Sequence, residues 1–181
     1  MFLSQTFRRL RVVSMLMAVL MLSFFASPSI ANTLDSLFEE LRNATDEMTA
    51  REIENRIWSS WFESGDAEID SLMQKAMQRK RVYDFNGAHA LLDEIIELKP
   101  DYSEAWNQRA TVYFHQGEQE KSLEAIARTL ELEPRHFGSM AGRIVIRLQQ
   151  FKHALARQNL IEALKIHPFL KERAFFPDLK Q

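Results

Sequence analysis

The fold is decided by residues 103–136, which read SEAWNQRATVYFHQGEQEKSLEAIARTLELEPRH. The stretch opens on a serine, a residue type that often caps a helix, and Gly117 interrupts it where a left-handed cap would end that helix. After the glycine, apolar residues recur at helical spacing: Leu123, Ile126, Ala127 and Leu130. Pro134 then closes the second helix, because the residue before a proline is biased away from helical geometry. We therefore expect a helical hairpin.

The hairpin pattern recurs with a period of 34 residues. Three prolines, each at the end of an apolar, acid-containing stretch, stand in this register: Pro100, Pro134 and Pro168. They define three units, at residues 69–102, 103–136 and 137–170. A small residue recurs at the twentieth position of each unit, where two helices would approach closely: Ala88, Ser122 and Ala156. A fixed period of this length is typical of stacked helical hairpins.

The chain resembles tetratricopeptide repeat (TPR) proteins over about 100 residues. The middle unit carries the family's signature most fully, at Trp106, Ala110, Tyr113, Gly117, Ser122, Ile126 and Pro134. The outer units depart from the signature at the turn between their helices, where Tyr83 and Phe151 replace the usual glycine. The resemblance implies an all-α fold, a right-handed α-solenoid built from three TPR units at residues 69–170.

Two further segments flank the predicted repeats. Apolar spacing predicts helices over Thr33–Asn43 and Met48–Glu63, which would form an N-terminal helical hairpin cap within residues 32–66. After the repeats, Phe169–Phe176 predicts a short closing helix that Pro177 stops, so residues 171–181 would form a C-terminal cap or tail. Such caps are expected because a repeat array must cover the apolar faces at its two ends.

The first 31 residues have the pattern of a secretory signal peptide. Three arginines precede the apolar run Val12–Ala26, and residues 27–31 supply a proline and a small-residue end suited to cleavage after Ala31. We therefore expect an exported bacterial protein of the periplasm. The alternative is an uncleaved leader that anchors the protein in the inner membrane as an envelope assembly or scaffold factor, although the run is shorter than a spanning helix requires.

The composition argues against several classes of function. The net charge is −2, and loss of a leader with three arginines and no acidic residue would make it −5, which disfavours a nucleic-acid binder. The chain has no cysteine, so disulfides and thiolate metal sites are excluded, and its five histidines show no metal-ligand spacing. No catalytic triad, phosphate-binding loop or nucleotide turn is present. We therefore predict no enzyme activity and no cofactor.

The TPR resemblance implies that the first helix of each unit lines a concave groove. The groove residues it implicates are Met73, Met77, Lys80, Arg81, Glu104, Asn107, Thr111, Phe114, His115, Val145, Leu148 and Gln149. Such a groove suits an extended peptide, a partner helix or a folded protein, which implies a non-catalytic interaction module. Two alternatives stay open: some apolar members pack against neighbouring helices, and the end caps associate into a homo-oligomer.

Overall fold

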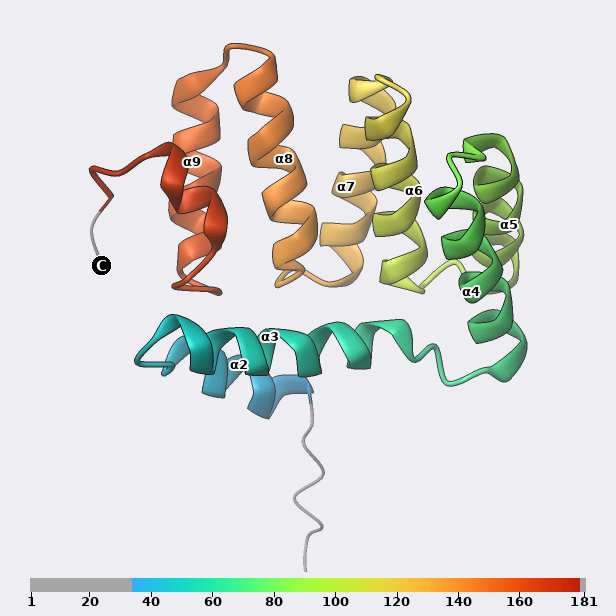
Figure 1. The fold of residues 1–181 in the computed structure, drawn as a ribbon, viewed down its shortest axis with the longest axis horizontal. Coiled ribbons are helices and arrows are strands. Elements are labelled where there is room, and N and C mark those ends of the chain that lie inside the picture. Colours follow the sequence, from blue (N-terminus) through green and yellow to red (C-terminus); the bar gives the residue numbers. More distant parts are fainter. Residues whose placement is uncertain (1–33, 180–181) are drawn as a thin grey trace, which may run out of the picture. The chain divides into compact units, whose positions relative to one another are not determined.

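The structure, a computed structural model, describes residues 34–179. Over this range the chain forms α-helices and one short 3-10 helix, η1, without any strand (Figure 1). The elements are α2 (Leu34–Arg42), α3 (Glu47–Phe62), α4 (Ala67–Arg81), α5 (Phe85–Leu98), α6 (Ser103–His115), α7 (Gln119–Leu132), α8 (Phe137–Gln149), α9 (His153–Leu164) and η1 (Lys171–Phe175). The expected all-α array of helical hairpins is confirmed.

Consecutive helices pair into hairpins, and the hairpins stack. Helix α4 packs on α5, α6 on α7 and α8 on α9, while α5 contacts α6 and α7 contacts α8. Small side chains permit the close approach within each hairpin: Ala88, Ser122 and Ala156 are each at most 1% exposed. The hydroxyl of Ser122 also donates a hydrogen bond of 2.8 Å to the backbone oxygen of Ala110 across its hairpin. The 34-residue pattern of small residues therefore sets the spacing of the helices.

The helices of the array begin and end where local chemistry favours it. Asp66 and Asp84 precede α4 and α5, and their carboxylates accept hydrogen bonds from the first backbone N–H groups of those helices. Glu133, which precedes a proline, has the extended φ and ψ of −134° and 93° and ends α7. The expected serine cap of α6 is wrong: the helix begins at Ser103 itself, and the preceding Tyr102 makes no side-chain cap.

The turns inside the three hairpins share one backbone conformation. Tyr83, Gly117 and Phe151, spaced 34 residues apart, have φ values of 61°, 78° and 58°. Glycine adopts positive φ freely, whereas a residue with a Cβ atom loses roughly 1–2 kcal/mol there. The two aromatic side chains are 79% and 84% exposed, so packing does not recover this loss. The first and third hairpins therefore contain strained turns.

We expect Tyr83→Gly and Phe151→Gly each to raise the free energy of unfolding by about 0.5–1 kcal/mol, because relief of the strain exceeds the added chain entropy of the unfolded state. Urea denaturation measures the change. The matched control is Gly117→Ala, for which we expect the free energy of unfolding to fall by about 1 kcal/mol. Open space surrounds the Cβ position of Gly117, so only the positive φ of the backbone opposes the new methyl group. If Tyr83→Gly and Phe151→Gly both lowered the free energy of unfolding, the two turns would not be strained.

The N-terminal hairpin packs in a different place from the stacked cap expected from the sequence. Figure 1 shows α3 running across the ends of α6 to α9 rather than continuing the stack beside α4. One core cluster joins the hairpin to α8, α9 and the segment after them: Leu37, Phe38, Leu41, Ile53, Ile57, Trp61, Phe137, Met140, Ile144, Leu160 and Leu170. The hairpin therefore packs mainly against the last unit of the array, with further contact from α3 to α6 of the second unit.

An aromatic cluster at the start of α8 explains this location. The Trp61 ring stacks on the His136 imidazole, with centroids 3.9 Å apart and planes 8° apart. Trp58 meets Phe137 edge to face at 5.5 Å. A Cβ atom on Gly138 would come within 2.4 Å of the Trp58 ring, so only glycine leaves room for the indole at this point. The bulky Trp58 side chain of α3 therefore fits the space that Gly138 leaves on the surface of α8.

We expect Gly138→Ala to lower the free energy of unfolding by about 1–3 kcal/mol, because the new methyl group overlaps the Trp58 ring and forces the hairpin to shift. Gly142→Ala in the same helix is the matched control. Its Cβ atom would meet only the Cδ1 atom of Ile126, at 3.4 Å, so we expect no loss and a gain of up to about 1 kcal/mol from helix propensity. Thermal denaturation of both variants checks the difference, and equal effects would contradict the complementarity.

The two ends of the chain complete the description. The predicted short helix after Pro168 is present as η1. The predicted signal peptide, residues 1–31, lies outside the described residues. Within residues 34–179, none of the helices has both the length and the apolar character needed to span a membrane.

Candidate functional site

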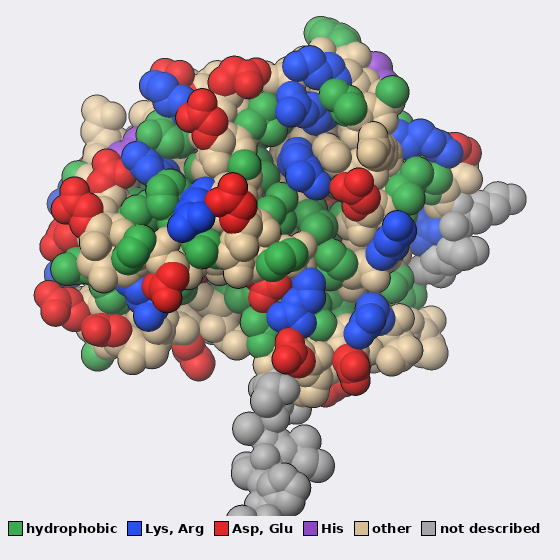
Figure 2. Space-filling model, turned by 180° about the vertical axis from the view of Figure 1, so that it is seen from behind, with side chains coloured by type: hydrophobic (Ala, Val, Ile, Leu, Met, Phe, Trp, Pro, Cys, Tyr) green, Lys and Arg blue, Asp and Glu red, His purple; other side chains and the backbone are tan. Residues whose placement is uncertain are grey.

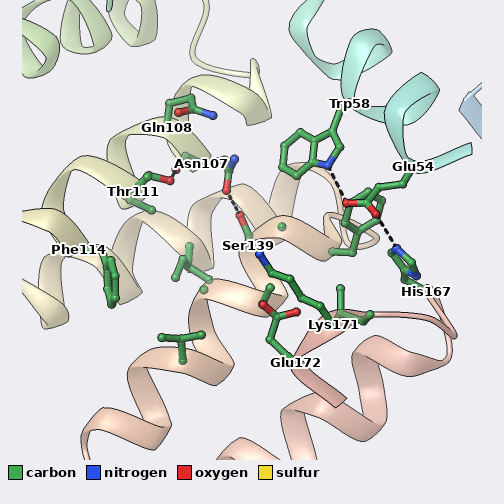
Figure 3. A pocket seen from close by; sticks show the side chains of 18 of the residues that line it. Glu54, Trp58, Asn107, Gln108, Thr111, Phe114, Ser139, His167, Lys171 and Glu172 are labelled. Carbon is green, nitrogen blue, oxygen red and sulfur yellow. Dashed lines mark hydrogen bonds and ion pairs between the residues drawn. The ribbon is translucent and has the colours of Figure 1, made fainter. Parts of the chain in front are cut away.

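A cavity of about 690 Å³ lies among α3, α6, α8 and the segment from His167 to η1 (Figure 3). Cavities of this size accept a small molecule or a few residues of a peptide. The cavity stands where the N-terminal hairpin crosses the second and third hairpins of the array. It is the candidate functional site.

The first wall of the cavity comes from α6 and α8. Asn107, Thr111 and Phe114 follow one face of α6, since residues three or four apart lie on the same side of a helix. Ala141 and Val145 supply the matching face of α8. The hydroxyl of Thr111 donates to the backbone oxygen of Asn107 at 3.0 Å. This wall is therefore apolar along Ala141 and Val145 of α8 and at Phe114, and it carries polar groups of α6 at Asn107, Thr111 and His115.

The second wall is polar and joins α3 to the C-terminal segment. The carboxylate of Glu54 accepts hydrogen bonds from Trp58 Nε1 at 3.2 Å and from His167 Nε2 at 3.3 Å (Figure 3). The hydrogen bond from His167 is the main reason that the pKa of Glu54 lies below its ordinary value, against the opposing effect of burial. Glu54 thereby holds the indole of Trp58 and the imidazole of His167 at the rim of the cavity.

The floor of the cavity carries a buried carboxylate. Glu172 on η1 is 4% exposed, and its Oε2 atom has no hydrogen-bond partner. Burial raises the pKa of Glu172, while its own backbone N–H and the nearby charge of Lys171 act in the opposite direction. Figure 3 shows both side chains entering the cavity from η1, across from Thr111 and Phe114. The floor therefore contains a buried carboxylate oxygen that lacks a hydrogen-bond donor.

The raised pKa of Glu172 predicts a dependence of stability on pH. The folded state holds the Glu172 proton more strongly than the unfolded state, so its contribution is lost as the pH rises from the unfolded value near 4.5 through the higher folded pKa. We therefore expect Glu172→Gln, which does not titrate, to be about 1 kcal/mol more stable than the parent at pH 7 and no more stable below pH 4.5.

Glu54→Gln is the control, for which we expect the opposite change in stability at pH 7. Because the pKa of Glu54 is lowered on folding, its carboxylate contributes stability above the unfolded value of 4.5 and loses it as the pH falls through the folded pKa. This variant should therefore be less stable than the parent at pH 7 and equal to it in acid. Urea denaturation at several pH values tests both variants. If their free energies of unfolding changed with pH in the same way relative to the parent, the opposite pKa shifts of Glu54 and Glu172 would be contradicted.

A buried polar network supports the α6 and α8 wall from behind. Glu104 is fully buried, and its carboxylate accepts hydrogen bonds from Gln108 Nε2 at 2.5 Å and Asn107 Nδ2 at 3.2 Å. His136 Nε2 lies 2.9 Å from the same carboxylate. The ammonium of Lys80 donates to Gln108 Oε1; burial lowers the pKa of Lys80, and the charge of Glu104 opposes that shift. Three donor side chains thus surround one buried acid, and Lys80 joins the network through Gln108.

The hydrogen bonds of His136 fix its tautomer and join α6 to α8. Its Nδ1 atom accepts a hydrogen bond of 3.2 Å from the backbone N–H of Ser139, and this contact caps α8. The ring hydrogen is therefore assigned to Nε2, which donates to Glu104. The hydroxyl of Ser139 donates to Asn107 Oδ1 at 2.7 Å, a second link between the two helices. The network sets the distance between the helices that form the first wall.

The structure brings together part of the groove predicted from the sequence. Five of the predicted residues line the cavity: Asn107, Thr111, Phe114, His115 and Val145. Asn107 also belongs to the buried network and is only 6% exposed, so its amide serves the fold as well as the cavity. These residues come from the first helices of the second and third units, α6 and α8.

The other predicted groove residues do not line the cavity. Met73 is 2% exposed and packs in the core among α4, α5 and α6, while Glu104 is fully buried behind the wall, so neither can face a partner as expected. The rest lie outside the lining: Met77, Lys80, Arg81, Leu148 and Gln149. For the residues of the first unit, the physical reason is the position of α3, which meets the array beside its second and third units. Leu148 and Gln149 stand at the last two positions of α8, beyond the residues of that helix that line the cavity.

Sequence reasoning missed the second wall and the floor. The residues concerned are Glu54, Trp58, His167, Lys171 and Glu172. Four of them belong to the N-terminal hairpin or to the segment after the repeats, outside the repeat register, whereas His167 stands near the end of the third unit. Glu54 and His167 are 113 positions apart in the chain, and no periodic pattern links them. The unusual number of bulky aromatic residues on α3 is the one sequence signal that this helix has a large partner surface.

Comparison with known proteins agrees with this architecture. Residues 91–124 match the family model described as tetratricopeptide repeat. A TPR repeat-containing protein from Rhizobium etli is 40% identical over 146 residues, which cover 79% of this chain and 70% of that protein. The chain belongs to the tetratricopeptide-repeat family. TPR proteins generally serve as protein-interaction modules, and their helical solenoids are typically non-catalytic scaffolds.

Two more distant similarities accompany this TPR assignment. A protein from Oryza sativa subsp. japonica, the DnaJ protein P58IPK homolog A, is 29% identical over 72 residues, or 40% of the TPR chain and 15% of the rice protein. The solved structure of the MamA RS-1 ArsTM double mutant aligns with a TM-score of 0.51 and 15% identity, covering 82% of this TPR chain and 80% of that chain. At this identity the likeness supports the fold alone.

Proposed function

We propose that this TPR protein is a non-catalytic adaptor that receives a peptide, a helix or a loop of a protein partner in the cavity. The observation that carries the proposal is the cavity of about 690 Å³, whose apolar α6 and α8 wall faces polar groups of α3 and η1. An apolar wall opposed by a few convergent polar groups is typical of binding sites. In TPR arrays the first helices of successive units form the surface offered to partners, and here α6 and α8 are those helices.

The charge distribution also favours the cavity over the rest of the surface. Figure 2 shows acidic and basic side chains interspersed over the face turned away from the view of Figure 1. Many of the charged groups on the described part of the chain are paired at close range, as in the ion pair of 2.7 Å between Arg135 and Asp35. A surface of mixed, paired charges offers no large region of one sign to a charged partner.

We further propose that the adaptor works in the bacterial periplasm. The support is the leader pattern of residues 1–31, with its basic start, apolar run and small-residue end. Cell fractionation of the full chain tests the location. Recovery of a shortened chain in the periplasmic fraction agrees with the proposal, whereas a full-length chain held in the membrane pellet after a carbonate wash would establish the anchored alternative.

An affinity capture experiment tests the adaptor function. The full chain with a C-terminal tag is used as bait in an envelope extract of the organism that encodes it, beside the variant Phe114→Ala. We expect a partner that binds the parent and is lost with Phe114→Ala, because Phe114 supplies the largest apolar side chain of the first wall. The matched control is Phe151→Ala, which removes the same ring from a site 84% exposed and outside the cavity.

The captured partner is then purified and titrated directly against the three proteins. Binding that is weakened at least tenfold by Phe114→Ala and unchanged by Phe151→Ala supports the cavity as the binding site. Equal binding by all three proteins would move the site to another surface. Absence of any specific partner would contradict the adaptor proposal. Melting temperatures of the variants separate loss of the contact from loss of the fold.

A further inference from the structure

Two hydrogen-bond acceptors in the cavity lack donors. The Oε2 atom of Glu172 is buried and unpartnered, and so is the Nδ1 atom of His167. The side chains themselves are 4% and 2% exposed. A buried polar atom without a partner costs about 1–3 kcal/mol, so such atoms are uncommon unless a ligand or another group satisfies them. Both belong to the polar side of the same cavity.

The His167 ring presents an acceptor because of its contact with Glu54. Its Nε2 atom lies 3.3 Å from a carboxylate oxygen of Glu54 and must carry the hydrogen to donate to it. In its neutral form the ring then has only a lone pair on Nδ1. Glu54 adds a further negative charge on the α3 side. The unmet demand in this part of the cavity is therefore for hydrogen-bond donors with positive charge.

The cations already present do not meet this demand. Lys171 is next to Glu172 in the chain and its charge acts on the carboxylate, but its side chain belongs to an exposed residue and leaves Oε2 without a hydrogen bond. Arg51 lines the cavity from α3, but its guanidinium pairs with Glu47 at 2.8 Å. The buried carboxylate thus remains available to an incoming donor.

We propose that the cavity binds a cationic donor group, a guanidinium or a primary ammonium, whose N–H groups reach Glu172 while its aliphatic stem lies along the apolar wall of Phe114 and Val145. Charge-assisted hydrogen bonds to a carboxylate are the strong kind, and burial limits their competition with water. In its peptide form this inference rests on the proposed function, because it names the side chain, arginine or lysine, that the partner inserts.

The test uses small probes that need no identified partner. The full chain is titrated by calorimetry with butylguanidinium and with its neutral analogue butylurea. A second pair consists of acetyl-Gly-Arg-Gly-amide and the same tripeptide with citrulline in place of arginine. We expect the cationic member of each pair to bind at least tenfold more tightly, since the neutral member lacks the charge. A peptide that binds more tightly than butylguanidinium indicates a partner side chain; equal binding indicates a free organic cation.

Glu172→Gln should abolish the preference for the cationic probes. It should not unfold the protein, because it removes an unpaired buried charge. The matched control is Glu47→Gln, which removes one negative charge from an exposed residue at the same cavity. No preference for the cations, or a preference that survives Glu172→Gln, would overturn the inference. Partner capture that is lost with Phe114→Ala but kept with Glu172→Gln would leave the adaptor function intact and reject only the cation.

Discussion

Glu104→Ala should lower the free energy of unfolding by about 3–5 kcal/mol, the largest effect expected of a single polar side chain here. The substitution removes the acceptor at the centre of the buried network and leaves the His136 and Gln108 donors without a partner. It also deprives the half-buried Lys80 of the charge that favours its ammonium form. Urea denaturation followed by circular dichroism measures the loss.

Two further variants test the reason for that loss. Glu124→Ala removes an exposed carboxylate from α7 and should change the stability by less than about 0.5 kcal/mol. Glu104→Gln keeps the shape and one acceptor oxygen but places an amide NH₂ among donors, so its loss should fall between those of the two alanine variants. If Glu104→Ala costs no more than Glu124→Ala, the network does not hold α6 and α8 together.

Trp61→Ala should lower the free energy of unfolding by about 3–5 kcal/mol and release the N-terminal hairpin from the array. The Trp61 side chain is 5% exposed, stacks on His136 and packs against Phe137 with ring centroids 4.8 Å apart. Its loss leaves a cavity in the cluster that joins α3 to α8. Because α3 forms one wall of the candidate site, we expect the same variant to lose the preference for cationic probes.

Limited proteolysis distinguishes release of the hairpin from general unfolding. A released hairpin should be cut at residues 63–66, between α3 and α4, while the α4–α9 array stays resistant. Met48→Ala is the control on the same helix, because Met48 is 74% exposed and should affect neither stability nor cleavage. Uniform digestion of Trp61→Ala would show instead that the array cannot stand without the hairpin.

Local sequence signals account for most of the secondary structure. The expected second helix of the middle hairpin, between Gly117 and Pro134, is present as α7, and the expected helix Met48–Glu63 matches α3 to within one residue. Both have apolar residues at helical spacing and polar or proline-containing ends, signals that act within a few residues. The predicted serine cap of α6 was wrong because the helix begins at Ser103 itself, one residue earlier than a cap at that serine requires.

Only part of the candidate site could be predicted from such local signals. Four of the α6 residues that line the cavity could be predicted, because the repeat register determines which face of each first helix points away from its hairpin partner: Asn107, Thr111, Phe114 and His115. Met73 holds an equivalent register position yet is buried, because register gives the direction of a side chain and not what covers it. Glu172 lies after the last repeat, and His167 stands near the end of the third unit beside Pro168, where the register gives no sign of its contact with Glu54.

The amino-acid sequence determines the helices, their pairing into hairpins and the stacking of those hairpins, because each depends on contacts between residues less than one repeat apart. Tertiary structure alone decides that α3 crosses to α8, since this depends on the fit of Trp58 beside Gly138, residues 80 positions apart. That crossing creates the second wall of the cavity and buries the unpaired carboxylate. The scaffold can therefore be predicted from periodicity, whereas the candidate site depends on one long-range fit between Trp58 and Gly138.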